Sequence, residues 1–441
     1  MDLCCDDPAR RWKGVLSAWP MFAALRNPRF ARLYAAQTVS QIGDALTWVG
    51  LALLAYRLTG GTDAAVVLGT ALTLRVLAFV VFGPLAGVIA DRVNRKWLLV
   101  GCDFGRVLVI GLLPFVTAVW QVYVLMFLVN SLTAFFTPTN QATVPLVVGQ
   151  ENSGPAFALS SATTELINIV GPGLAGVLAA LTGTRALFFV DAASFLISGL
   201  LILTLPALQA RQGGMQPGGG QPEKVQPEEM QRGTWSDIKD GSARLWRDPP
   251  IRFALLLELV AAVVGALILV NTINRVQGDL KLSESAYGLV MAAYGLGATL
   301  ASLVVGLAGK RWPRTRFILL GALLTSAAVM PGNVAPLPAI LVLWLLAGAG
   351  QSWVNLPAET LLAERTEQAA QGRVYGAHFA WSHLWYAFAY PLAGLLGTRL
   401  PRQDFLIGGA AALLLALVAL LLRPRSGEQA TPERSARPPP T

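Results

Sequence analysis

The chain alternates between long apolar runs and short polar segments. Each run has about 20 residues or more, the length that an α-helix needs to cross a lipid bilayer. Residues 206–250, which are rich in Gly, Pro and Gln, separate six runs from six others. The runs span 30–57, 64–90, 97–119, 122–148, 155–182, 185–205, 251–275, 285–309, 315–334, 337–363, 373–399 and 403–422. This pattern predicts an all-α polytopic membrane protein with twelve transmembrane helices.

The spacing of the runs divides the chain into five segments. A first six-helix bundle (30–205) and a second (251–422) are connected by a linker (206–250). The N-terminal tail (1–29) mixes basic residues with tryptophan, as in a segment that lies at a membrane surface. The C-terminal tail (423–441) ends in Pro-Pro-Pro-Thr and is typical of a disordered segment.

The composition excludes an ordinary soluble domain. Of the 441 residues, 54% are hydrophobic and only 13% are charged, whereas soluble domains contain about 25% charged residues. The net charge of +9 would attract nucleic acid, but Lys and Arg lie in short clusters between apolar runs and form no basic stripe. We therefore expect a lipid bilayer, and no nucleic acid, as a partner.

The basic residues also orient the helices, because Lys and Arg concentrate in the cytoplasmic loops of membrane proteins. With the N-terminus in the cytoplasm, the outer segments hold only six basic residues, and the inner tails and loops hold most of the others. The six are Arg57, Arg185, Arg275, Lys281, Arg399 and Arg402. We expect both termini in the cytoplasm and the chain in the inner (cytoplasmic) membrane.

No motif indicates an enzyme, a cofactor or a metal site. Residues 306–310 read Gly-Leu-Ala-Gly-Lys, but a phosphate-binding loop needs a wider spacing and a Ser or Thr after the lysine. Cys4, Cys5 and Cys102 have no metal-ligand spacing and form no disulfide framework. We expect no cleavable signal peptide before Cys4 and Cys5. Whether these two residues are acylated stays open.

A polar stretch between the second and third runs, residues 87–96, has the residue types of a contact that forms in only one of two conformations. We call it the gate stretch. The sequence Gly-Val-Ile-Ala-Asp-Arg-Val-Asn-Arg-Lys contains Gly87, Asp91, Arg92, Arg95 and Lys96. A small residue lets two helices approach closely, and a carboxylate after a helix end can cap a neighbouring helix. Such a contact forms only when the helices meet, so it stabilises one of two states. The alternative is an ordinary loop whose basic residues only fix orientation.

The two halves of the chain repeat one another. Residues 306–314 resemble the gate stretch 219 positions later, and Pro138 and Pro357 match at the same offset. Residues 173–176 correspond to 391–394 at an offset of 218. Parallel repeats of this kind are typical of transporters built from two similar helical bundles.

The stretch from Gly87 to Lys96 fits the pattern G-x-x-x-D-R-x-x-R-[RK] and resembles the loop between helices 2 and 3 of major facilitator transporters. Other segments are similar to one group of that family, which contains enterobactin exporters and macrolide or multidrug efflux proteins. These segments are 25–33, 40–44, 138–147, 235–249 and 372–375. The resemblance implies the major facilitator fold, with two pseudo-symmetric bundles and a short helix within 235–249.

The resemblance also implies a secondary active transporter of the drug:proton antiporter type. It would export a small hydrophobic or aromatic molecule, such as a drug, a macrolide or a siderophore, by alternating access. The expected partners are this substrate, protons and the bilayer, and we expect a monomer without a cofactor. An importer or a lipid flippase is the main alternative, since a fold does not fix the cargo. A non-transporting sensor on the same fold is a further alternative.

Ionisable residues inside a bilayer are candidates for proton coupling, because each costs about 2.5–3.5 kcal/mol to insert. Glu165 and His383 lie near the middle of their runs, and Asp44 lies toward the outer half of the first run. We hypothesise that Glu165, or else Asp44, gains and loses the coupling proton, and that His383 relays it. The alternative is that Glu165 forms a permanent structural pair with Arg75 or Arg106.

The run 373–399 carries many aromatic residues, several of them at mid-depth rather than at the membrane interfaces. Trp381, Trp385 and Tyr386, with Arg75 from the second run, are therefore candidates to line a cavity and contact a flat or cationic substrate. Core packing is the simpler alternative for most of these aromatic side chains.

Three further charged residues, Asp103, Arg106 and Glu258, also lie within the apolar runs. Asp103 and Arg106 are three residues apart on one helix, which predicts that they pair with each other or brace the gate stretch. Glu258 lies nearer the cytoplasmic end of its run.

Overall fold

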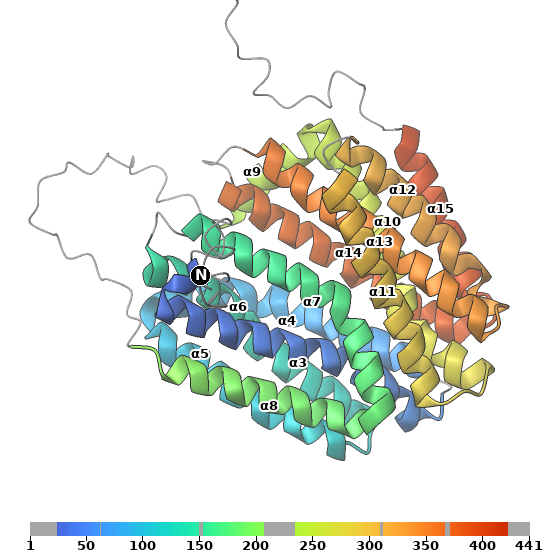
Figure 1. Ribbon diagram of the computed structural model, residues 1–441, viewed down its shortest axis with the longest axis horizontal. Helices are drawn as coiled ribbons and strands as arrows, with labels where there is room; N and C mark the ends of the chain where they lie inside the picture. Colours follow the sequence, from blue (N-terminus) through green and yellow to red (C-terminus); the bar gives the residue numbers. More distant parts are fainter. Residues whose placement is uncertain are drawn as a thin grey trace, which may run out of the picture. The chain divides into compact units, whose positions relative to one another are not determined.

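The computed structural model describes residues 24–61, 63–149, 153–206, 234–308, 312–366 and 371–421, and every regular element among them is a helix (Figure 1). The long helices are α3 (Pro28–Thr59), α4 (Ala64–Arg92), α5 (Arg95–Leu112), α6 (Val119–Val148), α7 (Ser153–Thr182), α8 (Thr184–Leu203), α10 (Pro249–Ile273), α11 (Glu284–Ala308), α12 (Arg314–Val329), α13 (Leu337–Arg365), α14 (Gln371–Arg399) and α15 (Asp404–Leu421). The shorter helix α9 (Thr234–Arg247) lies where the resemblance implied one before the seventh run. The predictions for the two tails, and for Cys4 and Cys5, concern residues that lie almost entirely outside the described part.

Ten helices within the described ranges are long and apolar enough to cross a membrane. They are α3, α4, α5, α6, α8, α10, α11, α12, α13 and α15, some of them trimmed or extended at one end. Helices α7 and α14 have 30 and 29 residues and coincide with two further predicted runs. The all-α membrane architecture is confirmed, and the full count of twelve crossings stays a prediction.

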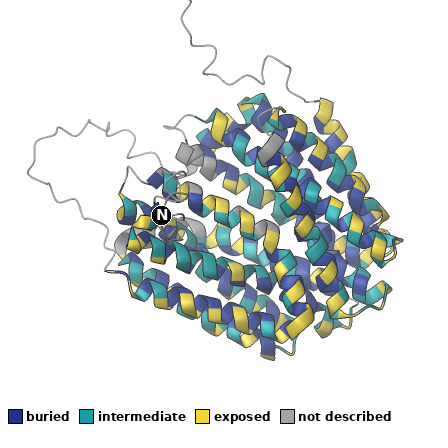
Figure 2. Ribbon diagram, viewed as in Figure 1, coloured by how far each residue is buried: buried dark blue, intermediate teal, exposed yellow. Residues whose placement is uncertain are grey.

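Exposed residues, yellow in Figure 2, occur along many helices, and many of them have large apolar side chains. Leu421, Val334 and Leu181 are 84%, 83% and 77% exposed. Soluble monomers rarely expose extended apolar surface. It is the surface expected of helices that face lipid.

Contacts between residues divide the chain into two compact units. The first comprises Met1–Gly50 and Leu77–Gln212, and the second comprises Leu51–Val76 and Gly213–Thr441. The units follow the two predicted bundles except for residues 51–76, the end of α3 and the start of α4, which belong to the second unit. The bundle boundaries at 30–205 and 251–422 stay a prediction.

Helix α10 lies at the core of the second unit. Its side chains are buried on all sides, as expected for a helix that is hydrophobic all round. Asp248 caps its start by accepting a hydrogen bond from the backbone N–H of Ile251 at 3.1 Å, and Pro249 and Pro250 follow. Helices α12, α13, α14 and α15 contact α10, so a polar side chain on α10 must find its partners on these helices.

Small residues set the spacing around α13. A Cβ atom added at Gly297 of α11 would overlap the carbonyl of Leu345, and one added at Gly348 would overlap the carbonyl of Tyr294. The backbones of α11 and α13 therefore approach as closely as glycine permits, a common packing mode in membrane helices. This packing fixes the position of α13, which carries Glu359.

Candidate functional site

The first unit holds a buried ion pair on α5. Arg106 donates a hydrogen bond to Asp103, and their side chains are 2% and 0% exposed. Ser198 of α8 donates to Oδ2 of Asp103 at 2.8 Å. The guanidinium lies over the rings of Phe136 and Phe195, at 4.1 and 4.3 Å from their centroids. The structure therefore contains the pair that the sequence predicted, with partners for both charges.

Asp191 of α8 is a buried acid that the sequence analysis did not single out. It is 0% exposed, accepts a hydrogen bond from Thr47 of α3, and accepts another at Oδ1 from Ser194 at 3.2 Å. A Cβ atom added at Gly43 would overlap Asp191 and Ser194, so α3 and α8 approach closely here. The sequence signal that could have identified Asp191 is an acidic residue inside the apolar run 185–205.

Asp44, one of the predicted coupling residues, is close enough to Asp191 for the two carboxyl groups to interact electrostatically. Asp191 also interacts with Arg106. Asp191 therefore connects Asp44 with the Asp103–Arg106 pair in the first unit.

Glu165, the first-choice coupling residue, belongs to α7, and its side chain lies outside the described residues. The same is true of the side chains of Gly87, Asp91 and Arg92 in the last turns of α4. The roles predicted for these residues stay predictions.

The described part of the gate stretch binds backbone carbonyls. Asn94 caps α5 by accepting a hydrogen bond from the N–H of Lys96 at 3.1 Å. Arg95 donates from Nη1 to the carbonyl of Ala142 at 2.7 Å, and Lys96 donates from Nζ to the carbonyl of Leu205 at 2.6 Å. These bonds tie the start of α5 to α6 and to the residues after α8.

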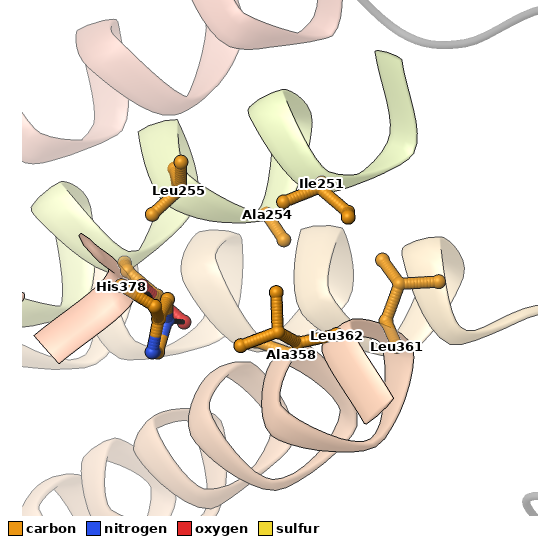
Figure 3. Close-up of a pocket in the computed structure, with 8 residues that line it drawn as sticks. Ile251, Ala254, Leu255, Ala358, Leu361, Leu362 and His378 are labelled. Atoms are coloured by element: carbon orange, nitrogen blue, oxygen red, sulfur yellow. Dashed lines mark hydrogen bonds and ion pairs between the residues drawn. The ribbon is translucent and has the colours of Figure 1, made fainter. Parts of the chain in front are cut away.

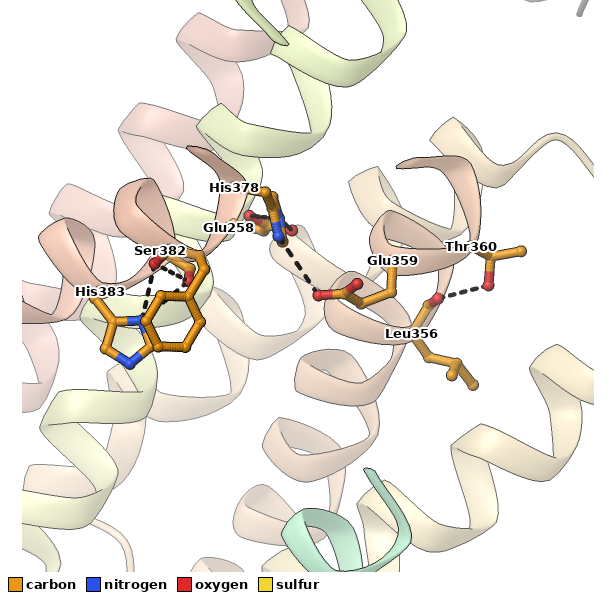
Figure 4. Close-up of polar contacts among 8 residues, drawn as sticks. Glu258, Leu356, Glu359, Thr360, His378, Ser382 and His383 are labelled. Atoms are coloured by element: carbon orange, nitrogen blue, oxygen red, sulfur yellow. Dashed lines mark hydrogen bonds and ion pairs between the residues drawn. The ribbon is translucent and has the colours of Figure 1, made fainter. Parts of the chain in front are cut away.

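In the second unit, three helices bring Glu258, His378 and Glu359 together (Figure 4). Nε2 of His378 on α14 lies 3.0 Å from both carboxylate oxygens of Glu258 on α10. Nδ1 of His378 lies 3.6 Å from Oε1 of Glu359 on α13. The side chains of Glu258 and His378 are each 10% exposed, whereas that of Glu359 is 45% exposed. We call these three residues the acid–histidine cluster.

A small cavity adjoins the acid–histidine cluster (Figure 3). Glu258 and His378 are among its lining residues, and the others are apolar. These are Ile251, Ala254, Leu255, Ala358, Leu361 and Leu362. The sequence analysis placed Glu258 toward one end of its run but did not connect it with His378, and it did not single out Glu359.

Arg75 lies on the part of α4 that belongs to the second unit, and it interacts electrostatically with His383, Tyr386 and Tyr390 of α14. Nδ1 of His383 lies 2.8 Å from the carbonyl of Phe379 on its own helix (Figure 4 labels His383). The rings of Tyr386 and Tyr390 stack with centroids 5.2 Å apart. The structure therefore brings together three residues that the sequence named separately, Arg75, His383 and Tyr386.

The two candidate tryptophans have different surroundings. Trp381 donates from Nε1 to Oγ of Ser242 on α9 at 3.2 Å, and its ring meets that of Trp246 edge-on at 5.1 Å. This contact with the linker helix favours a packing role for Trp381. Nε1 of Trp385 is buried and has no hydrogen-bond acceptor among the described residues. A donor of this kind is available to a ligand.

Comparison with known proteins gives matches along most of the chain. The sequence model of the Major Facilitator Superfamily matches residues 33–274 and 254–441. An uncharacterized MFS-type transporter of Bacillus subtilis (strain 168), YfiS, is 26% identical over 406 residues, which cover 88% of this chain and 92% of the relative. Macrolide efflux protein A of Streptococcus pyogenes is 24% identical over 412 residues, which cover 89% of this chain and 96% of the relative.

The fold is also similar to that of solved transporters. The crystal structure of the nucleoside transporter NupG matches with a TM-score of 0.65 at 14% identity, over 89% of this chain and 98% of that one. This similarity confirms the fold class that the sequence predicted.

Proposed function

This chain belongs to the Major Facilitator Superfamily, and we propose that it exports a small hydrophobic or aromatic molecule in exchange for protons. The family is one of membrane transporters, which supports transport rather than enzymatic activity. A relative that matches along nearly its full length is named a macrolide efflux protein, which supports export and suggests a drug, a macrolide or a siderophore as cargo.

The observation that carries the proposal is the presence of buried ionisable side chains within the membrane-spanning helices of both units. Asp191 of α8 in the first unit is 0% exposed, and the side chain of Glu258 of α10 in the second unit is 10% exposed. Such residues are costly in a bilayer and mark proton or substrate pathways. A carboxyl or imidazole group that is alternately dry and wet during alternating access changes its proton occupancy, which links proton movement to the conformational change.

We assign roles to the candidate residues as follows. Glu165, or else Asp44, which interacts with Asp191, exchanges the coupling proton, and His383 relays it. Arg75, Tyr386, Trp385 and, less directly, Trp381 line the substrate path. Gly87, Asp91, Arg92, Arg95 and Lys96 stabilise one state of the gate. Asp91→Asn would leave the protein in the membrane but strongly reduce transport.

Under this proposal the protein is a multi-pass monomer of the inner membrane with both termini in the cytoplasm. It acts on a small molecule and on protons, and it has no nucleic-acid partner. A proton that moves inward across about 100 mV releases about 2.3 kcal/mol, and a tenfold pH difference adds about 1.4 kcal/mol. One proton per cycle therefore sustains a gradient of about 500-fold for a neutral cargo.

Everted membrane vesicles from an efflux-deficient host test this proposal. An imposed gradient, acidic inside, should drive uptake of labelled erythromycin or of one member of a panel of fluorescent dyes. Uptake should stop when the gradient is collapsed and should fall in Glu165→Gln or Asp44→Asn. Vesicles without the protein are the control.

Two results would contradict the proposal. Proton exchange would be excluded if uptake by the wild type did not depend on the pH gradient and both variants kept the same uptake. Accumulation only in right-side-out vesicles would identify an importer.

A further inference from the structure

Helix α9, labelled in Figure 1, has two sides of different character. Gly241 and Leu245 are buried, and Leu245 belongs to an apolar core that includes residues of α10, α13 and α14. Lys239, Arg244 and Arg247 are exposed. Since an α-helix turns by about 100° per residue, the buried and the exposed side chains project from opposite sides. We call the exposed side, with its three cations, the basic face of α9.

Polar contacts hold the other side of α9 against the second unit. Trp381 of α14 donates from Nε1 to Oγ of Ser242 at 3.2 Å. Asp248, the residue that follows α9, accepts hydrogen bonds from Nε of Arg365 on α13 at 2.8 and 3.1 Å. These contacts fix the direction in which the basic face points, which is away from α13 and α14.

The basic face lies where the chain enters the membrane. The stretch Pro249–Asp279, which is long and apolar enough to span a bilayer, begins two residues after Arg247. Two residues of chain extend over at most about 7 Å, and Arg244 lies less than one helical turn before Arg247. The ring of Trp246 packs edge-on against that of Trp381, and Trp is frequent at the level of the lipid headgroups. The end of α9 is therefore at headgroup level.

The basic face carries an excess of positive charge. Residues 239–247 contain its three cations and one acid, Asp240, which gives a net charge of +2 at neutral pH. Arg252, in the first turn of α10, adds a cation nearby, since its Nη1 donates to the carbonyl of Trp246 at 3.5 Å. Within the described ranges, none of the three cations of the basic face forms an ion pair. Cations without a partner in the protein are available to an anionic partner outside it.

We propose that the basic face of α9 binds the headgroups of anionic phospholipids, such as phosphatidylglycerol, in the leaflet that α10 enters. The guanidinium groups of Arg244 and Arg247 suit a lipid phosphate because each donates two parallel hydrogen bonds to its oxygens, and Lys239 adds a point charge. Bound lipid then holds the linker helix at the membrane surface. The inference goes beyond the proposed function and uses from it only the cytoplasmic position of the linker.

The position of the basic face favours lipid over other anions. Each Lys or Arg beside an anionic membrane surface adds to the attraction, and the headgroups are already present there at high local concentration. A nucleic acid or an acidic protein would have to displace them. The exposed cations of α9 do not enclose a site for a free phosphate ion.

Native mass spectrometry of the purified full-length protein tests the inference by titrating the lipids that stay bound. Phosphatidylglycerol and phosphatidylcholine with the same acyl chains differ only in the headgroup, so a difference in affinity measures recognition of the headgroup. The wild type should bind phosphatidylglycerol more tightly. This preference should shrink when the ionic strength rises from about 0.15 M to about 1 M, because the Debye length falls from about 8 Å to about 3 Å.

Two double variants, each of which removes two exposed arginines, locate the site. Arg244→Gln/Arg247→Gln should weaken phosphatidylglycerol binding about fivefold for each charge removed and should bind phosphatidylcholine as the wild type does. Arg399→Gln/Arg402→Gln is the matched control, because these arginines are also exposed but lie at the end of α14 and just beyond it, away from α9. It should keep the preference of the wild type.

Equal affinity of the wild type for the two lipids would overturn the inference, as would unchanged phosphatidylglycerol binding in Arg244→Gln/Arg247→Gln. Displacement of the lipid by an equal concentration of glycerol phosphate would also overturn it, because the site would then bind a free phosphate. The assay measures lipid binding and not transport. A protein that prefers phosphatidylglycerol yet fails the vesicle experiment would therefore contradict the proposed export function and leave this inference intact.

Discussion

Arg106 in the first unit is a cation beside an acid, and His378 in the second unit is a group that can be protonated beside two acids. Their surroundings differ. Arg106 is enclosed by Asp103, by two aromatic rings and by α8. His378 lies between two acids, one of which is 45% exposed, and borders a cavity. We therefore expect the loss of a charged group to destabilise the protein more in the first unit than in the second.

The largest effect on stability is expected when the buried Asp103–Arg106 pair loses its cation. Arg106→Leu leaves Asp103 buried without its ion-pair partner, and breaking a buried pair in this way costs about 3–5 kcal/mol. Thermal unfolding of the purified protein, followed by circular dichroism, should show this loss. The double variant Arg106→Leu/Asp103→Asn should recover part of it, because the buried charge is then removed. An unchanged unfolding temperature in Arg106→Leu would show that the Asp103–Arg106 pair does not stabilise the fold.

A smaller effect is expected from Thr47→Val, which preserves the shape of the side chain but removes the hydroxyl that donates to Asp191. A buried carboxyl group that loses one donor should reduce the free energy of unfolding by about 1–3 kcal/mol. Thr182→Val is the control, since that exposed hydroxyl donates to the carbonyl of Leu178 on its own helix. Equal unfolding temperatures for the two variants would argue against a structural role for the Thr47 contact.

The smallest effect on stability is expected in the second unit. Glu258→Gln keeps an acceptor for His378, and the cluster is already partly open, so the free energy of unfolding should fall by about 1 kcal/mol or less. Asp103→Asn, measured in the same way, should cost more because it leaves Arg106 buried without an ionised partner. If Glu258→Gln destabilised the protein as much as Arg106→Leu, the contrast between the two clusters would be wrong.

The candidate site was predicted in part. Arg75, His383 and Tyr386 were singled out because polar and aromatic residues at mid-depth are unusual, and the structure groups them. Asp191 and Glu359 were not singled out, although each is an acid within an apolar run. What makes them notable is their neighbours on other helices, Thr47 and Asp44 for Asp191 and His378 for Glu359. A single run of sequence does not contain this information.

The all-α membrane architecture, the approximate helix bounds and the family could be predicted from the amino-acid sequence. They depend on local and repeating properties, which are the length of an apolar run, the residues at its ends and the spacing of motifs. Three features became visible only in the folded chain: residues 51–76 pack with the second unit, Trp381 contacts the linker helix α9, and Glu258 and Glu359 meet at His378. Helices pack where small residues such as Gly297 and Gly348 allow close approach, and these contacts join positions far apart in the chain.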